Sequence, residues 1–163
     1  MKELYILRHA DAVKGGSEIA DFDRQLSKVG IAEARFIGKK CKDSFLVPDV
    51  IYSSSARRAL TTAIILAEEI NFVQDKMVIL PQLYDIYPDQ MMEIILATSD
   101  EHSKVMLVGH NPVLSVFLNL FTLEGVYHLP TGTLVKITYS NIDNWKGIKD
   151  VKGTIESIWK PLG

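Results

Sequence analysis

Short, wholly apolar segments alternate with helical segments along this chain, and this alternation constrains the fold more than any other feature. Four such runs are typical of strands: residues 4–7, 50–52, 78–80 and 105–108, of which 4–7 and 105–108 are expected to lie in the buried centre of a sheet. Between them, apolar residues recur at three- and four-residue spacing, as on one face of an amphipathic helix. Two further β-rich segments span residues 133–139 and 154–159. The pattern predicts an α/β fold: one three-layer domain over residues 1–163, with a mainly parallel central sheet flanked by helices.

Local signals mark where several helices begin. Ser27 is a suitable N-cap for the helix that follows it. Pro88 is expected to open a short helix, and Pro112 suits the first position of another. The polar stretch 11–25 contains two adjacent glycines and is expected to form a loop.

Charge and cysteine content argue against several classes of function. The 18 Lys and Arg and 20 Asp and Glu give a net charge of −2 without a basic stripe, so neither nucleic acid nor an anionic membrane is an expected partner. The one cysteine, Cys41, lies on the apolar phase of its helix and leaves no internal disulfide or Cys-rich zinc site. The longest apolar region, 105–123, is interrupted by Gly-His-Asn-Pro, and the first residues do not resemble a signal peptide. A cytoplasmic protein is therefore expected.

Polar residues follow three of the predicted strands at the point where each strand ends. They are Arg8 and His9 after the first strand, residues 53–55 with Arg57 and Arg58 after the second, and Gly109, His110 and Asn111 after the fourth. The carboxyl ends of parallel strands meet at one edge of a sheet, where ligands bind in open α/β folds. Helix N-termini at that edge add unpaired backbone N–H groups. The sequence therefore predicts an anion pocket lined by arginines and imidazoles.

This combination of residue types suits phosphoryl transfer. The guanidinium of arginine can hold a phosphate through two parallel N–H groups. A neutral imidazole near pH 7 can attack phosphorus, and a second one can hydrogen-bond to the transferring group. Two Arg and two His would then do by positioning and electrostatics what metal ions do elsewhere. No metal or cofactor is expected, since the Asp21 and Asp23 pair has no His or Cys at ligand spacing.

The same residues carry a resemblance to a known family. The segment RHADA at 8–12 resembles the Arg-His-Gly signature of the histidine phosphatase superfamily. The segment SSSARRALTTA at 53–63 resembles its Ser-Pro-x-x-Arg-Ala-x-x-Thr segment, and VGHNP at 108–112 resembles the segment with its second histidine. DRQLSKVGIAEA at 23–34 and LPTG at 129–132 are similar to the small bacterial branch, the phosphohistidine phosphatases related to the one acting on two-component signalling proteins.

The resemblance implies a phosphoglycerate-mutase-like fold and a role for each matching residue. His9 would be the phosphorylated nucleophile, while Arg8, Arg58 and His110 would bind the phosphoryl oxygens, with Asn111 beside them. Ala10 and Ser55 replace the glycine and the proline of the motifs. Asp85 lies nearest to the place where larger members carry a general acid, a group that the small branch often lacks. The expected function is a metal-independent phosphatase that acts on phosphohistidine in proteins.

Two alternatives stay open at this stage. The chain could hydrolyse a small phosphorylated metabolite, or it could be a degenerate member that binds phosphoproteins without turnover. Mutase activity fits less well, because residues 59–109 leave little room for a cap over the pocket. Arg57, His102 and His128 are interpreted as surface or structural residues.

Overall fold

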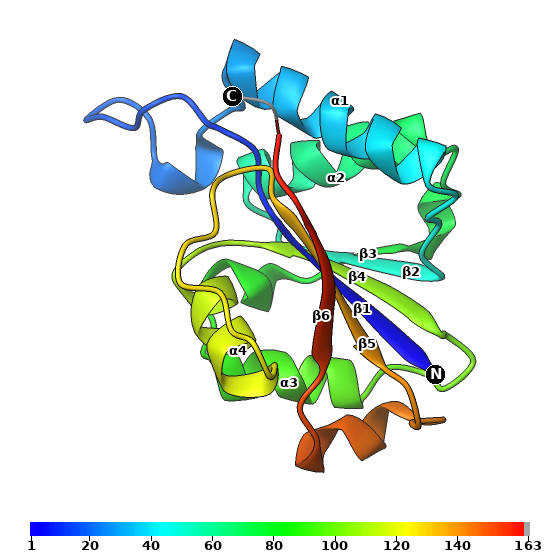
Figure 1. The fold of residues 1–163 in the computed structure, drawn as a ribbon. Helices are drawn as coiled ribbons and strands as arrows, with labels where there is room; N and C mark the ends of the chain where they lie inside the picture. The colour runs from blue at the N-terminus through cyan, green and yellow to red at the C-terminus, as the bar shows by residue number, and fades with distance from the viewer. Residues whose placement is uncertain (162–163) are drawn as a thin grey trace.

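The predicted strand segments pair into one six-stranded sheet in the computed structural model, which describes residues 1–161 (Figure 1). The strands are β1 (Lys2–Arg8), β2 (Val50–Ser53), β3 (Met77–Ile79), β4 (Lys104–Gly109), β5 (Leu134–Tyr139) and β6 (Thr154–Trp159). Their order across the sheet is β3-β2-β4-β1-β5-β6. The four strands from β3 to β1 are parallel, whereas β5 and β6 pair antiparallel with their neighbours. The expected single α/β domain with a mainly parallel sheet is confirmed.

Helices cover both faces of this sheet, as the apolar runs predicted. Helices α1 (Lys28–Asp43) and α2 (Arg57–Glu69) lie on one face, and α3 (Pro88–Leu96) and α4 (Val113–Phe121) lie on the other (Figure 1). The central strands are buried on both sides because their side chains alternate between the two cores. In β1, Leu4 and Ile6 pack toward α3 and α4, whereas Tyr5 and Leu7 pack toward α1 and α2.

Several boundaries differ from the predicted ones by one or two residues. Strand β1 includes Arg8, which the pattern placed just after it. Strand β3 ends at Ile79, and α4 begins at Val113, directly after Pro112. The expected loop 11–25 also contains a 3-10 helix, η1 (Asp21–Asp23), because a single polar turn has no hydrophobic periodicity to reveal it. Three more 3-10 helices follow: η2 (Gln74–Lys76), η3 (Pro81–Tyr84) and η4 (Trp145–Asp150).

The register of the parallel strands brings their carboxyl ends to one edge. Arg8 lies opposite Gly109, and Ser53 lies opposite Val108. The residues that follow these strands therefore start from neighbouring points. Within residues 1–161, no helix is both long and apolar enough to cross a membrane.

Helix α1 fixes the chain segment that follows β1. The Ser27 hydroxyl oxygen accepts a hydrogen bond from Gly30 N at 3.0 Å, as expected of an N-cap, and Ser27 N donates to the Asp11 carbonyl at 3.0 Å. A Cβ at Gly30 would lie 1.9 Å from that same carbonyl oxygen. Glycine is thus required here by the close approach of backbone to helix.

We expect Gly30→Ala to lower the free energy of unfolding by about 1–3 kcal/mol, the usual range for overpacking. The sign of this change in the free energy of unfolding is informative, because replacing glycine by alanine at an open helical position would stabilise the helix by about 1 kcal/mol. Gly16→Ala is the control, since a Cβ there meets no atom within 4 Å. Urea unfolding of both variants measures the difference. Equal stability of Gly30→Ala and the wild type would show that the Asp11 carbonyl does not pack against α1 at Gly30.

Candidate active site

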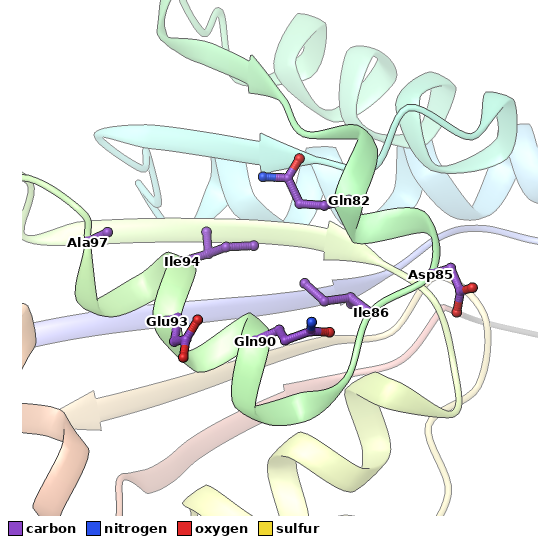
Figure 2. Close-up of a pocket in the computed structure, with 7 residues that line it drawn as sticks. All are labelled: Gln82, Asp85, Ile86, Gln90, Glu93, Ile94 and Ala97. Atoms are coloured by element: carbon purple, nitrogen blue, oxygen red, sulfur yellow. The ribbon is translucent and has the colours of Figure 1, made fainter.

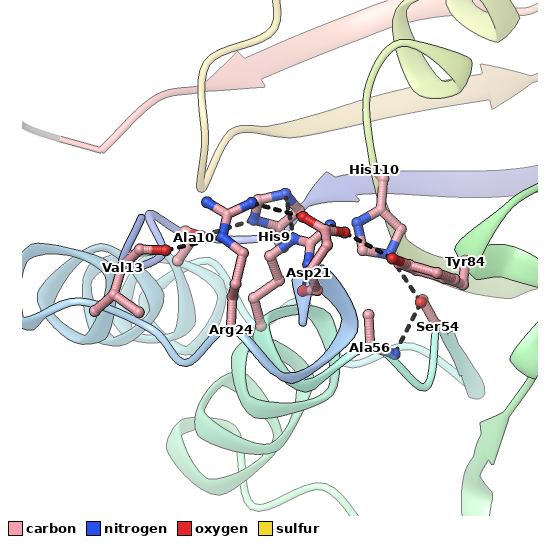
Figure 3. Close-up of polar contacts among 10 residues, drawn as sticks. His9, Ala10, Val13, Asp21, Arg24, Ser54, Ala56, Tyr84 and His110 are labelled. Carbon is pink, nitrogen blue, oxygen red and sulfur yellow. Dashed lines mark hydrogen bonds and ion pairs between the residues drawn. The ribbon is translucent and has the colours of Figure 1, made fainter. Parts of the chain in front are cut away.

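The side chains of His9, Arg58 and His110 meet at the carboxyl edge of the sheet, as the sequence predicted. His9 follows β1 and His110 follows β4 (Figure 3). Arg58 lies in the first turn of α2. All three are buried, at 6–7% exposure. The imidazole rings of His9 and His110 have centroids 5.2 Å apart. Positive charge and two imidazoles are therefore concentrated in a small, largely desolvated space.

Two hydrogen bonds fix the state of the His9 ring. Its Nδ1 lies 2.7 Å from the carbonyl oxygen of Ala10, which can only accept, so Nδ1 carries the proton. Its Nε2 lies 3.3 Å from Nε of Arg58, which can only donate, so Nε2 carries the lone pair. Burial is the main cause that lowers the pKa of His9 to about 4, and the nearby charge of Arg58 lowers it further. His9 is therefore a neutral imidazole near pH 7, with a lone pair on Nε2.

Arg58 and Arg57 point into different surroundings, although they are adjacent. Arg57 is exposed, whereas Arg58 is buried and contacts His9. The rest of the Arg58 guanidinium is held by Asp21: Nη1 donates to its carbonyl oxygen at 2.7 Å, and Nη2 donates to its carboxylate at 3.1 Å. The structure thus places the arginine that matches the family motif, and not its neighbour, at the pocket.

His110 has one engaged ring nitrogen and one unpaired one. Its Nε2 lies 2.8 Å from the hydroxyl of Ser54, a buried residue that directly follows β2. Its Nδ1 is buried and has no hydrogen-bond partner within residues 1–161. Burial, followed by the charges of neighbouring residues, lowers the pKa of His110 to about 3, so this ring is neutral as well.

Within the part of the chain that the structure describes, Arg8 has a side-chain N–H group without a hydrogen-bond partner, whereas the side chain of Asn111 is hydrogen-bonded through both its oxygen and its nitrogen. Nη1 of Arg8 donates to the Leu129 carbonyl at 2.8 Å, whereas its Nε is buried without a partner among the described residues. The side-chain oxygen of Asn111 accepts hydrogen bonds from the backbone N–H and the hydroxyl of Ser115. The side-chain N–H of Asn111 donates to the Leu129 carbonyl at 3.3 Å. Asn111 therefore anchors the start of α4 here, and its expected contact with a substrate stays a prediction.

Asp85 lies at the rim and makes no hydrogen bond within the described chain. It is exposed and borders two cavities. One, of about 390 Å³, runs along α3 (Figure 2). The other, of about 470 Å³, reaches His110 and is otherwise mostly apolar. A substrate in the second cavity could meet Asp85, so its role as a general acid also stays a prediction.

The structure adds a cluster that the sequence did not assign to the site. Asp21, in η1, accepts hydrogen bonds on its carboxylate from Arg24 at 3.0 Å and from the Tyr84 hydroxyl at 2.7 Å, besides the one from Arg58 (Figure 3). The Tyr84 ring packs edge-on against His110, with centroids 5.6 Å apart. Hydrogen bonds from Tyr84 and Arg24, together with the charge of Arg58, hold the pKa of Asp21 well below its usual range.

Thr62, in α2, connects the segment after β1 with the first turn of α2. Its hydroxyl oxygen accepts from Ala10 N at 3.0 Å and its O–H donates to the carbonyl of Arg58 at 2.7 Å. Thr62 is the threonine of the Ser-x-x-x-Arg-Ala-x-x-Thr segment, so that motif contained a signal for it. No comparable spacing indicated Asp21 or Tyr84, which reach the pocket only through the fold.

The arrangement is suited to bind an oxyanion and to attack it. Buried N–H groups without partners are rare, and the unpaired nitrogens of Arg8 and His110 could both donate to an anion. Arg58 can redirect its N–H groups to the same anion. Within residues 1–161, no three His, Cys, Asp or Glu side chains gather where they could hold a metal ion.

Comparison with known proteins identifies the family of the chain and its fold. The family model for the histidine phosphatase superfamily (branch 1) matches residues 4–93. No curated protein sequence matches the chain significantly.

Solved structures share the whole fold. The protein assigned as phosphohistidine phosphatase SixA from Agrobacterium tumefaciens is 27% identical, with a TM-score of 0.84 over 98% of both chains. The protein so assigned from Nakamurella multipartitia is 20% identical, with a TM-score of 0.82 over 99% of this chain and 97% of that one. The protein histidine phosphatase SixA in complex with tungstate is 18% identical, with a TM-score of 0.82 over 98% and 97% of the two chains. The chain belongs to the histidine phosphatase superfamily, branch 1.

Proposed function

We propose that this phosphatase forms a phosphohistidine intermediate on His9, without a metal ion, and that its substrate is phosphohistidine in a protein. The observation that carries the proposal is the state of His9: a buried, neutral imidazole whose Nε2 lone pair faces the guanidinium of Arg58. A nucleophile for phosphorus needs such a lone pair and a cation beside it that can receive the phosphoryl oxygens.

The reaction proceeds in two displacements. Nε2 of His9 attacks phosphorus, and the bond from phosphorus to the leaving group breaks while Arg58, Arg8 and His110 hold the three phosphoryl oxygens. Nδ1–H keeps its hydrogen bond to the Ala10 carbonyl, which stabilises the ring as positive charge develops on it. Water then attacks phosphorus, the P–N bond to His9 breaks, and phosphate leaves with the lone pair restored to Nε2.

Three observations favour a protein substrate. The pocket lies at an open edge of the sheet, beside a mostly apolar cavity of about 470 Å³ that another protein surface could contact. Between α2 and β4 the chain forms only β3, α3 and two short 3-10 helices, and none of these covers the pocket as a separate cap. The relative from Agrobacterium tumefaciens, assigned as a phosphohistidine phosphatase, is similar over nearly its whole length. A role in signalling and a cytoplasmic location would accompany such a substrate.

The first test traps the intermediate. Rapid quenching of the enzyme with labelled substrate should yield a phosphoenzyme that survives alkali and is lost in acid, as a P–N bond is. His9→Ala should give no label and no turnover. Turnover of an aryl phosphate by the wild type also separates an enzyme from a binding module. Label on serine or aspartate, or full activity of His9→Ala, would contradict the mechanism.

The second test separates the two adjacent arginines. Arg58→Lys keeps the charge but loses the planar fork, so kcat/KM for an aryl phosphate should fall on the order of 10²-fold. Arg57→Lys, an exposed position in the same turn, should stay near the wild-type value. The opposite pattern would show that Arg57 binds the phosphoryl group.

The third test uses Asp85 to decide between phosphohistidine and an alkyl phosphate as the substrate. An alkoxide leaving group needs a proton during P–O cleavage, whereas imidazole departs with little help. Asp85→Asn should therefore leave turnover of a phosphohistidine protein within a few-fold of wild type, and alkyl phosphates should be poor substrates throughout. If the wild type hydrolyses an alkyl phosphate efficiently, and Asp85→Asn loses roughly 10²-fold of that rate, the substrate is a phosphorylated metabolite.

A further inference from the structure

Asp21 is the one acidic side chain that contacts the catalytic groups among residues 1–161, and the mechanism above gives it no role. Its carboxylate touches Nη2 of Arg58, while Nε of the same guanidinium touches Nε2 of His9. The nucleophile and the carboxylate are therefore separated by a single guanidinium group. Figure 3 shows His9 and Asp21 close together in the site.

Asp21 also lies at the opening of the pocket. Its side chain is 53% exposed, whereas His9, Arg58 and His110 are buried behind it. A substrate that enters past Asp21 meets its carboxylate before it reaches the buried groups. In-line attack by Nε2 of His9 sends the leaving group away from His9, and for a substrate that enters past Asp21 the leaving group would lie near this carboxylate.

A phosphohistidine substrate has an N–H group that a carboxylate at this position could bind. In its reactive form the substrate ring carries phosphorus on one nitrogen and a proton on the other, and the ring is cationic. When the P–N bond breaks, the electron pair stays on the leaving nitrogen, and the product is neutral imidazole with the proton still on the distal nitrogen. No proton has to reach the leaving atom, but the distal N–H has to be present and is best held by an anion.

We propose that Asp21 is a specificity residue whose carboxylate accepts a hydrogen bond from the distal N–H of the substrate imidazole. The proposal rests on the proposed function, because it names how that substrate class is recognised. The contact stabilises the cationic ring and so favours the form from which imidazole can leave. Arg24 and Tyr84 hold the carboxylate in place when Arg58 turns toward the phosphoryl group.

The environment of Asp21 fits an acceptor and not an acid. A carboxylate offers about four acceptor sites, of which Oδ2 uses two and Oδ1 one in this structure. One site on Oδ1 is therefore free to accept from the substrate. Its pKa lies well below the usual range, mainly because Tyr84 and Arg24 donate to it, so it has no proton to give to an alkoxide. An alcohol leaving group gains nothing from Asp21.

The test compares two substrates on matched variants. A peptide phosphorylated on histidine has the distal N–H, whereas p-nitrophenyl phosphate has a leaving group that needs neither a proton nor this contact. Asp21→Asn should lower kcat/KM for the peptide by about tenfold or more and leave the aryl phosphate within a few-fold. Asp23→Asn is the control, since Asp23 lies in the same 3-10 helix and is exposed. It should change neither substrate.

The outcomes separate this inference from the proposed function. The inference is overturned if Asp21→Asn leaves the ratio of the two kcat/KM values as it is in the wild type. No loss on either substrate would mean that Asp21 does not contact the leaving group. An equal loss on both would mean that Asp21 only positions Arg58. If the wild type does not prefer the phosphohistidine peptide to an alkyl phosphate, the proposed function is wrong and this inference fails with it.

Discussion

The hydrogen bond from His9 Nδ1 to the carbonyl of Ala10 is the contact on which the rest of the site depends. It places the proton on one ring nitrogen and so leaves a lone pair on the other, where Arg58 meets it. A ring with the opposite tautomer would present an N–H to the guanidinium, and two donors would then face each other. Ala10 N is in turn held by Thr62, in the helix that carries Arg58. The orientation of the ring and the position of the cation therefore come from one connected set of backbone and side-chain contacts.

The parallel sheet makes this set of contacts stiff. Strands β1 and β4 are adjacent and buried on both faces, so a shift of one relative to the other would disturb both cores at once. Because Arg8 is paired with Gly109, the two histidines begin one residue beyond a fixed pair. The geometry of the candidate site thus depends on strand register, and the burial of the apolar strand residues sets that register.

Features of the fold that depend on buried periodicity were predictable from the sequence. The apolar runs indicated the strands, with β1 and β4 at the buried centre, and the polar residues after them indicated the edge where the pocket lies. Asp21 and Tyr84 were not predictable in this way. They lie in 3-10 helices of three and four residues, which are too short to show a periodicity, and only tertiary packing determines which side chain turns inward. In η3, Leu83 is buried at 2% exposure, and this anchors the turn so that Tyr84 contacts Asp21 while the adjacent Asp85 stays at the rim.

The two histidines can lie close to two arginines because both imidazole rings are neutral. Burial and the neighbouring cations keep both imidazoles neutral, with pKa values of about 4 for His9 and about 3 for His110. In the proposed mechanism His9 needs a neutral ring in order to attack. His110 does not, and a phosphoryl group bound beside its unpaired Nδ1 would favour its protonated form, since an opposite charge raises the pKa of an imidazole. In the proposed mechanism the substrate itself would therefore shift the second histidine toward the charged donor, while the ring of His9 would become positive only as the P–N bond forms.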